Sequence, residues 1–147
     1  NFITCYSATQ CAYTITAEMN DIIIKYAEYY KRDDILKYLQ ESKYGIWLGA
    51  HESQGFALEE ALAINVPLLV WNVKYMSQEV RSNYEDIFAT TIPYFDKSCG
   101  EYFYKESEFS NKYSEFISKL NTYNPRKFIL NNLNVKQCAD KLLDIIN

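Results

Sequence analysis

The stretch that decides the fold is residues 44–71, which read YGIWLGAHESQGFALEEALAINVPLLVW. The two ends of this stretch, residues 44–48 and 68–71, are short and apolar without polar alternation, as is typical of strands buried on both faces of a sheet. Between them, residues 56–64 place Ala, Leu and Ile side chains on one side of a helix. A strand, a helix and a second strand joined by short links predict two parallel strands with a helix packed on them.

The neighbouring residues extend this pattern. Asn65 tolerates a left-handed backbone and is expected to cap the helix, and Pro67 prevents the helix from continuing. Earlier in the chain, residues 22–26 are rich in isoleucine and predict another buried strand. The segment from Asp33 to Lys43 begins with two aspartates and carries an apolar stripe, which predicts a helix. The sequence therefore predicts an α/β fold, a Rossmann-like open parallel sheet with flanking helices.

The rest of the chain is patterned less regularly. Residues 1–20 are ambiguous, since residues 13–16 fit a strand and residues 17–19 fit the beginning of a helix. Residues 90–95 contain a proline within an apolar run and are expected to form an edge strand or an extended loop. Helical spacing predicts helices over residues 84–89, 113–120, 126–130 and 135–146. We expect the last of these helices to pack back on the sheet and to close the fold.

The composition is that of a globular protein. The 147 residues are 48% hydrophobic and correspond to one domain on the usual scale of about 100–200 residues. The net charge of −4 argues against nucleic acid and against an anionic membrane surface, because both attract clustered Lys and Arg. The longest strongly apolar run, residues 66–71, is too short to span a bilayer, and the first residues do not resemble a signal peptide. We therefore expect a cytoplasmic protein without a transmembrane segment.

The cysteines do not form a metal-binding pattern, and the many tyrosines have a separate explanation. Cys5, Cys11, Cys99 and Cys138 are scattered without a Cys-x-x-Cys pair, and the chain has one histidine, so no metal site is expected. Cys5 and Cys11 are near enough in the sequence to form a disulfide. The 14 tyrosines suit half-buried surfaces and partner contacts, although an AT-rich genome would also favour Tyr codons.

The loop after residues 44–48 is the candidate ligand site, because ligands of open α/β sheets bind beyond the carboxyl ends of the strands. The next helix turns free N–H groups and the positive end of its dipole toward this loop, which favours a phosphate, and Gly55 lets a ligand approach the backbone. Glu52 and Glu60 are acceptors when ionised and suit sugar or ribose hydroxyls. The alternative is that both glutamates are merely solvated, as most surface glutamates are.

Residues 45–72 as a whole resemble the donor-binding motif of retaining glycosyltransferases of the GT-B fold, especially the family 4-like group (glycosyl transferases group 1). The resemblance covers about residues 22–75, which are 54 of the 147 residues. The matching pieces are the Glu-x7-Glu pair, the Gly-Phe, the Glu-Ala-x-Ala and the Val-Pro before the next strand, here Glu52 with Glu60, Gly55-Phe56, Glu60 to Ala63, and Val66-Pro67.

This resemblance implies a role for each matching residue. Glu52 would be the catalytic residue that contacts the hydroxyls of the donor sugar, and Glu60 would hold the ribose hydroxyls. The residues that would surround the sugar and the diphosphate are His51, Ser53, Gln54, Gly55 and Phe56, the last three through backbone amides. The turn formed by Glu28, Tyr29 and Tyr30 would contact the nucleotide base, unless these tyrosines are simply exposed structural residues.

The resemblance also implies a longer enzyme. In the family, an N-terminal acceptor domain completes the active site and a basic Arg–Lys pair clamps the diphosphate, and neither has a match in this chain. Residues 1–147 are therefore expected to be a single nucleotide-sugar-binding domain, the C-terminal half of a GT-B fold. The whole enzyme would transfer a sugar from a nucleoside diphosphate to a hydroxyl acceptor with retention, with no cofactor, and the missing domain or a partner subunit could place it peripherally at a membrane.

Two alternatives remain open at this point. The first is a non-catalytic nucleotide-sugar-binding or assembly domain of the same fold. The second is another open α/β protein, such as a flavodoxin-like module that binds a phosphate or a partner, in which the spacing of the two glutamates is a coincidence.

Overall fold

The computed structural model describes residues 2–6, 22–25, 32–49, 51–76, 84 and 86–146. Within this part of the chain, five strands form one sheet in the order β2-β1-β3-β4-β5, and every neighbouring pair is parallel. The strands are β1 (Phe2–Tyr6), β2 (Ile22–Lys25), β3 (Tyr44–Leu48), β4 (Leu68–Trp71) and β5 (Gly100–Phe103). This is a doubly wound order, in which the chain reverses its direction of travel across the sheet after β2.

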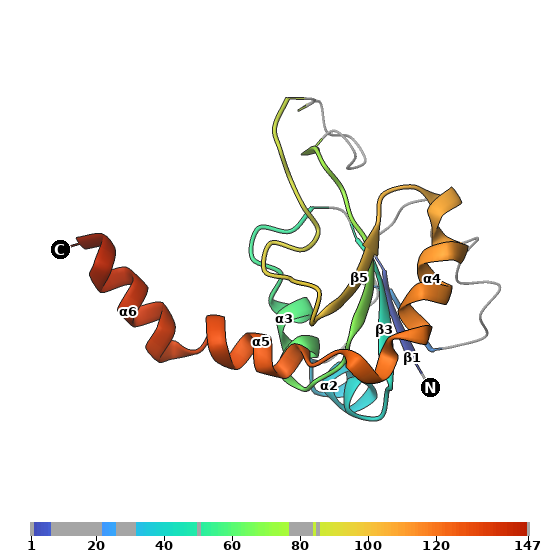
Figure 1. The fold of residues 1–147 in the computed structure, drawn as a ribbon, viewed down its shortest axis with the longest axis horizontal. Helices are drawn as coiled ribbons and strands as arrows, with labels where there is room; N and C mark the ends of the chain where they lie inside the picture. The colour runs from blue at the N-terminus through green and yellow to red at the C-terminus, as the bar shows by residue number, and fades with distance from the viewer. Residues whose placement is uncertain are drawn as a thin grey trace.

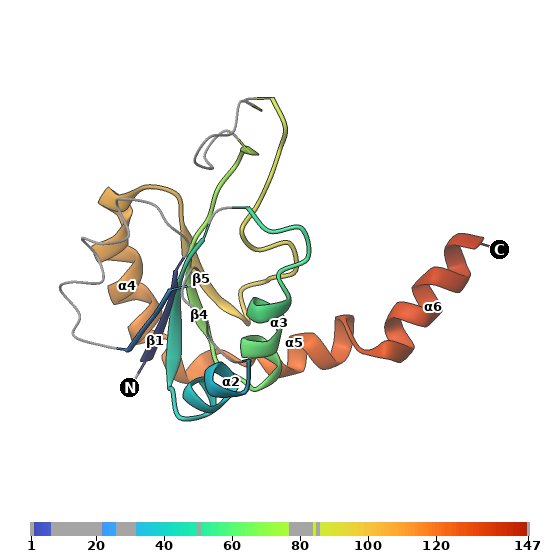
Figure 2. The same cartoon turned by 180° about the vertical axis from the view of Figure 1, so that it is seen from behind.

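The described helices connect or follow these strands. They are α2 (Arg32–Gln40), α3 (Phe56–Ala63), α4 (Phe109–Ser118), α5 (Pro125–Asn132) and α6 (Val135–Ile146), with short 3₁₀ turns at η2 (Glu106–Glu108) and η3 (Leu120–Thr122). In Figure 1, α4 lies on one side of the sheet, whereas α2 and α3 lie on the other. Figure 2 shows the same two layers from behind.

Two apolar cores fill the space between the sheet and these helices. In β3, Trp47 belongs to the first core, whereas its neighbours Ile46 and Leu48 belong to the second, as the alternation of side chains along a strand requires. The first core is formed by Ile35, Leu39, Trp47, Leu58, Ala61, Leu62, Val66, Leu68, Val70 and Cys99. The second is formed by Tyr44, Ile46, Leu48, Leu69, Phe103, Phe116 and Tyr123. A sheet that is covered on both faces explains why β3 and β4 lack polar alternation.

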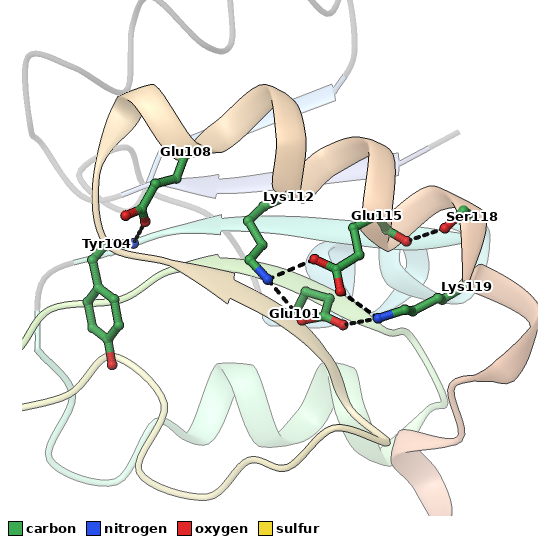
Figure 3. Close-up of polar contacts among 7 residues, drawn as sticks. All are labelled: Glu101, Tyr104, Glu108, Lys112, Glu115, Ser118 and Lys119. Atoms are coloured by element: carbon green, nitrogen blue, oxygen red, sulfur yellow. Dashed lines mark hydrogen bonds and ion pairs between the residues drawn. The ribbon is translucent and has the colours of Figure 1, made fainter.

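A network of charges fastens α4 to the edge strand β5 (Figure 3). The carboxylate of Glu101 in β5 lies 3.1 Å from Lys119 Nζ and 3.8 Å from Lys112 Nζ. Glu115 of α4 joins the same two lysines, at 2.8 Å from Lys112 and 2.5 Å from Lys119. Hydrogen bonds from these two lysines hold the pKa of Glu115 down at about 2.

The sequence predicted β2, β3, α3 and β4 correctly, but it did not indicate β1, which lies between β2 and β3. The strands at 44–48 and 68–71 have the expected bounds, β2 begins at residue 22 as expected, and α3 ends one residue before the expected end. Asn65 has a positive φ of 69°, and its N–H and that of Val66 donate to the carbonyls of Leu62 and Ala61 at the end of α3. The α/β class with an open parallel sheet and flanking helices is confirmed for the described residues.

The prediction for α6 was half wrong. The helix has the expected bounds, but none of its side chains is buried, and it projects away from the rest of the fold (Figures 1 and 2) instead of packing on the sheet. Val135 is 88% exposed and Ile145 is 80% exposed. Helical periodicity indicates which side of a helix is apolar, but it does not indicate what covers that side.

Other predictions in the irregular regions also need correction. The described residues between 84 and 89 form no helix; instead Phe88 makes an isolated antiparallel bridge with Tyr75. Residues 90–95 form a loop with bends at residues 91, 93 and 94 and no strand, and the edge strand beside β4 is β5, which the sequence did not indicate. The expectations for residues 13–19 lie outside the described residues.

Candidate functional site

The candidate site lies where the strand order reverses. Leu48, the last residue of β3, is paired with Tyr6 of β1 on one side and with Trp71 of β4 on the other. The chain runs outward from β1 to β2 and then crosses back to β3, so the connections after β1 and β3 leave in opposite directions. A crevice at such a switch point is where doubly wound folds bind their ligands. The loop from Gly49 to Gly55 begins at this point.

Gly55 gives the loop its entry into α3. It has φ 74° and ψ 40°, a left-handed conformation that favours glycine, and its carbonyl accepts the first N–H of the helix ladder, from Glu59, at 2.9 Å. By the geometry of the helix, the N–H groups of Phe56, Ala57 and Leu58 have no carbonyl one turn earlier in α3. These groups and the dipole of α3 are therefore directed toward the loop, which is the arrangement that attracts an anion.

Glu52 is the acidic residue of the loop and lies three residues before Gly55 in the sequence. Its side chain is half-buried, and the loss of hydration raises the pKa of its carboxyl, while the neighbouring His51 acts in the opposite direction. A carboxylate that has lost part of its hydration gains more than a solvated one from hydroxyl donors of a ligand. Burial also raises the pKa of Glu59, which stands on the first turn of α3 beside the half-buried Glu60.

A second segment, Thr90 to Pro93, lies along the loop and is called the strap below. The carbonyl of Thr90 accepts the backbone N–H of Glu52 at 2.9 Å. A Cβ atom at Gly55 would lie 3.7 Å from Pro93 Cγ, and one at Gly49 would lie 3.3 Å from Thr91 Cγ2. The strap therefore touches the loop near its beginning, its middle and its end.

The strap is in turn held by a buried residue that follows β4. Asn72 is 4% exposed, and its side-chain oxygen accepts hydrogen bonds from Thr90 Oγ1 and from Thr91 N, each at 2.8 Å. Asn72, Thr90 and Thr91 were not among the site residues predicted from the sequence. The available signal was the position of Asn72, a polar residue directly after a buried strand, at the same edge of the sheet as the loop.

Most of the site residues predicted from the sequence lie in the loop or in the first two turns of α3. His51 to Gly55 stay together in the loop, Phe56 begins α3 with 68% of its surface exposed, and Glu60 lies on the second turn of the same helix. Ser53 and Gln54 are exposed. The expected base-contacting residues Glu28, Tyr29 and Tyr30 lie outside the described residues.

The described residues offer no metal-binding group and no membrane-spanning helix. No three His, Cys, Asp or Glu side chains gather there as a metal-binding group would require. None of the helices found there combines the length and the apolar character needed to cross a bilayer. Cys99 is buried and Cys138 is exposed, and both are free thiols, while Cys11 lies outside the described residues and leaves the pairing with Cys5 a prediction.

Comparison of the chain with protein-family models, with curated proteins and with solved structures found no significant match. The strand order alone defines the class of protein, which is an open, parallel α/β domain with a candidate ligand site at the switch point of its sheet.

Proposed function

We propose that this chain is the donor-binding domain of a retaining glycosyltransferase of the GT-B fold, acting in the synthesis of glycans. The observation that supports this most is the position of the loop from His51 to Gly55. It leaves β3 at the switch point of the sheet and enters α3 through a left-handed glycine, with one glutamate in the loop and another on the helix. The ligand that this arrangement suits carries both hydroxyls and phosphates.

The proposed binding mode assigns one part of the donor to each part of the site. The diphosphate of a nucleoside diphosphate sugar lies at the N–H groups that begin α3, near Gln54, Gly55 and Phe56. The carboxylate of Glu52 accepts hydrogen bonds from hydroxyls of the sugar, with His51 and Ser53 beside it, and Glu60 accepts hydrogen bonds from the ribose. Glu28, Tyr29 and Tyr30 remain the residues expected at the base.

The same arrangement would assist the transfer of the sugar. As the bond between the sugar and the diphosphate breaks, positive charge develops on the sugar ring and negative charge on the leaving diphosphate. The carboxylate of Glu52 stabilises the first charge, and the N-terminal end of α3 stabilises the second. The acceptor hydroxyl would be supplied from a further domain or a partner subunit, so the proposed whole enzyme has a second part, and we propose that it works in the cytoplasm.

Calorimetric titration of the chain with UDP, GDP and their sugars tests this proposal. We expect saturable binding in the millimolar range or below for at least one of these ligands. Glu60→Gln removes a charged acceptor and is expected to weaken the binding by about tenfold. Glu41 is an exposed residue that precedes β3, whereas the candidate site follows it. Glu41→Gln therefore serves as the matched control and is expected to bind like the wild type.

Two other functions compete with this proposal. A non-catalytic domain of the same fold would bind the nucleotide sugar, but Glu52→Ala and Glu60→Ala in a longer parent protein would leave sugar transfer unchanged. A flavodoxin-like module is favoured by one observation, because the strand order β2-β1-β3-β4-β5 is the order of that fold. Such a module would bind a phosphate or a partner at the same loop and would bind equally well after Glu60→Gln.

A further inference from the structure

Asn72 joins segments that are distant in the sequence. Its side-chain oxygen accepts three hydrogen bonds, one from the backbone N–H of Val73 at 2.9 Å and two from Thr90 and Thr91, which lie 18 and 19 residues further along the chain. Its side-chain nitrogen donates to Tyr104 Oη at 3.4 Å, and its backbone N–H donates to the carbonyl of Phe103 at 2.7 Å. Asn72 is thereby fixed to the ends of β4 and β5 and holds the strap against them.

The strap connects Asn72 to the candidate site through Thr90. Thr90 is bound to Asn72 through its hydroxyl, and its own carbonyl accepts the backbone N–H of Glu52. The same hydroxyl accepts the N–H of Ile92 at 3.1 Å, so the strap is also braced within itself. The path from Asn72 to Glu52 consists of two hydrogen bonds and one residue, and all of its groups belong to the described part of the chain.

We propose that Asn72 is a positioning residue for Glu52. It does not touch the donor; it fixes the strap, and the strap fixes the backbone of Glu52 at the switch point. This role rests on the proposed function, because the position of Glu52 affects binding only if Glu52 contacts a ligand. An oxygen acceptor at position 72 is the essential feature, since all three donors to the side chain converge on one oxygen atom.

Substitutions at position 72 separate this role from a merely structural one. Asn72→Asp keeps the oxygen that accepts the three hydrogen bonds, whereas Asn72→Leu has a similar size and keeps none of them. Thr90→Val removes one of the three donors, together with the acceptor of the Ile92 N–H, and leaves the backbone carbonyl of Thr90 in place. We therefore expect this milder variant to fold even if Asn72→Leu does not. Thr122→Val is the matched control, because the hydroxyl of Thr122 also donates one hydrogen bond but lies in η3.

Two readouts on the same samples of the chain test the proposal. The first is hydrogen exchange at the backbone N–H of Glu52 without ligand, with the N–H groups of α3 as the internal reference. We expect faster exchange at Glu52 in Asn72→Leu and in Thr90→Val, with α3 unchanged, and exchange like that of the wild type in Asn72→Asp and Thr122→Val. The second is the affinity for the UDP and GDP sugars, whose sugar hydroxyls Glu52 is proposed to contact; we expect it to fall about tenfold or more in Asn72→Leu and to be kept in Asn72→Asp.

The outcomes distinguish this inference from the proposed function. If the wild type binds none of the UDP and GDP sugars, the proposed function fails and the positioning role fails with it. If the wild type binds but Asn72→Leu and Thr90→Val leave the exchange at Glu52 or the affinity unchanged, the inference alone is overturned. If Asn72→Asp loses binding to the same degree as Asn72→Leu, the acceptor oxygen is not the essential feature, and the inference is again overturned.

Discussion

Gly100 and Leu68 approach each other so closely that no side chain fits between them. A Cβ atom at Gly100 would lie 1.9 Å from the carbonyl oxygen of Leu68, and Gly100 has a φ of 144°. The two residues are paired in register at the beginning of β4 and β5. A glycine at this position is therefore required for β5 to pair with β4. The core between the sheet and α4 depends on this pairing, because Phe103 of β5 belongs to it.

We expect Gly100→Ala to destabilise the domain by about 3 kcal/mol or more, because the clash is with backbone and cannot be relieved by a side-chain rotation. Urea unfolding followed by circular dichroism measures the change. Gly49→Ala is the matched comparison, since its Cβ would meet side-chain atoms at 3.1 Å and beyond, and we expect a smaller loss. Equal losses for the two variants would contradict the described pairing of β4 and β5.

Gly55 is favoured by its backbone conformation and not by a lack of space for a side chain. A Cβ atom there would meet its nearest neighbours at 3.7 Å, which is ordinary contact, so the cost of Gly55→Ala comes from the left-handed backbone alone. We expect a loss of about 1–2 kcal/mol in the free energy of unfolding. Gly55→Asn should cost less, because asparagine tolerates this conformation better than alanine. An alanine variant as stable as the asparagine variant would be inconsistent with the left-handed entry into α3.

The network around Glu115 predicts a dependence of stability on pH. Hydrogen bonds from Lys112 and Lys119 lower the pKa of Glu115 from 4.5 to about 2 in the folded chain. Because the folded pKa is the lower one, the stabilisation is present above pH 4.5 and is lost as the pH falls through about 2. We therefore expect Glu115→Gln to lower the melting temperature at neutral pH and to lower it progressively less across this acid range. A melting temperature difference that is independent of pH would contradict this.

The exposed position of α6 is tested by two substitutions of the same kind. Leu62 of α3 is fully buried, whereas Leu142 of α6 is 58% exposed. We expect Leu62→Ala to cost about 2–5 kcal/mol and Leu142→Ala to cost about 0.5 kcal/mol or less. Urea unfolding of both variants at one protein concentration provides the comparison. A large loss for Leu142→Ala would mean that α6 packs on the fold, as the sequence alone had predicted.

The parts of the fold that could be predicted are those whose signals are local. The strands at 44–48 and 68–71 are continuous apolar runs, and α3 between them is closed by Asn65 and Pro67, so no other segment is needed to recognise them. β5 is different, because Gly100–Phe103 has no continuous apolar run and is recognised as a strand from its pairing with β4, which begins where Gly100 meets Leu68. The placement of α6 also depends on partners that its own periodicity does not reveal.

In the candidate site too, only the part with local sequence signals could be predicted. The loop from His51 to Gly55 could be located from the sequence because it follows a recognisable strand and precedes a recognisable helix. The strap and Asn72 could not, since the hydrogen bonds that join Asn72 to Thr90 and Thr91 connect residues far apart in the chain. Their residue types, Asn and Thr, are common in loops for unrelated reasons.

The proposed function requires that the loop after β3 binds a nucleoside diphosphate sugar. The most direct measurement is a titration of the folded chain with UDP, GDP and their sugars, followed residue by residue through the backbone amide resonances. We expect saturable shifts in the millimolar range or below, centred on Gln54, Gly55 and Phe56 at the start of α3, and weaker binding of the nucleotide sugars after Glu52→Gln. The absence of binding by every one of these ligands at millimolar concentration, or shifts confined to residues far from this loop, would contradict it.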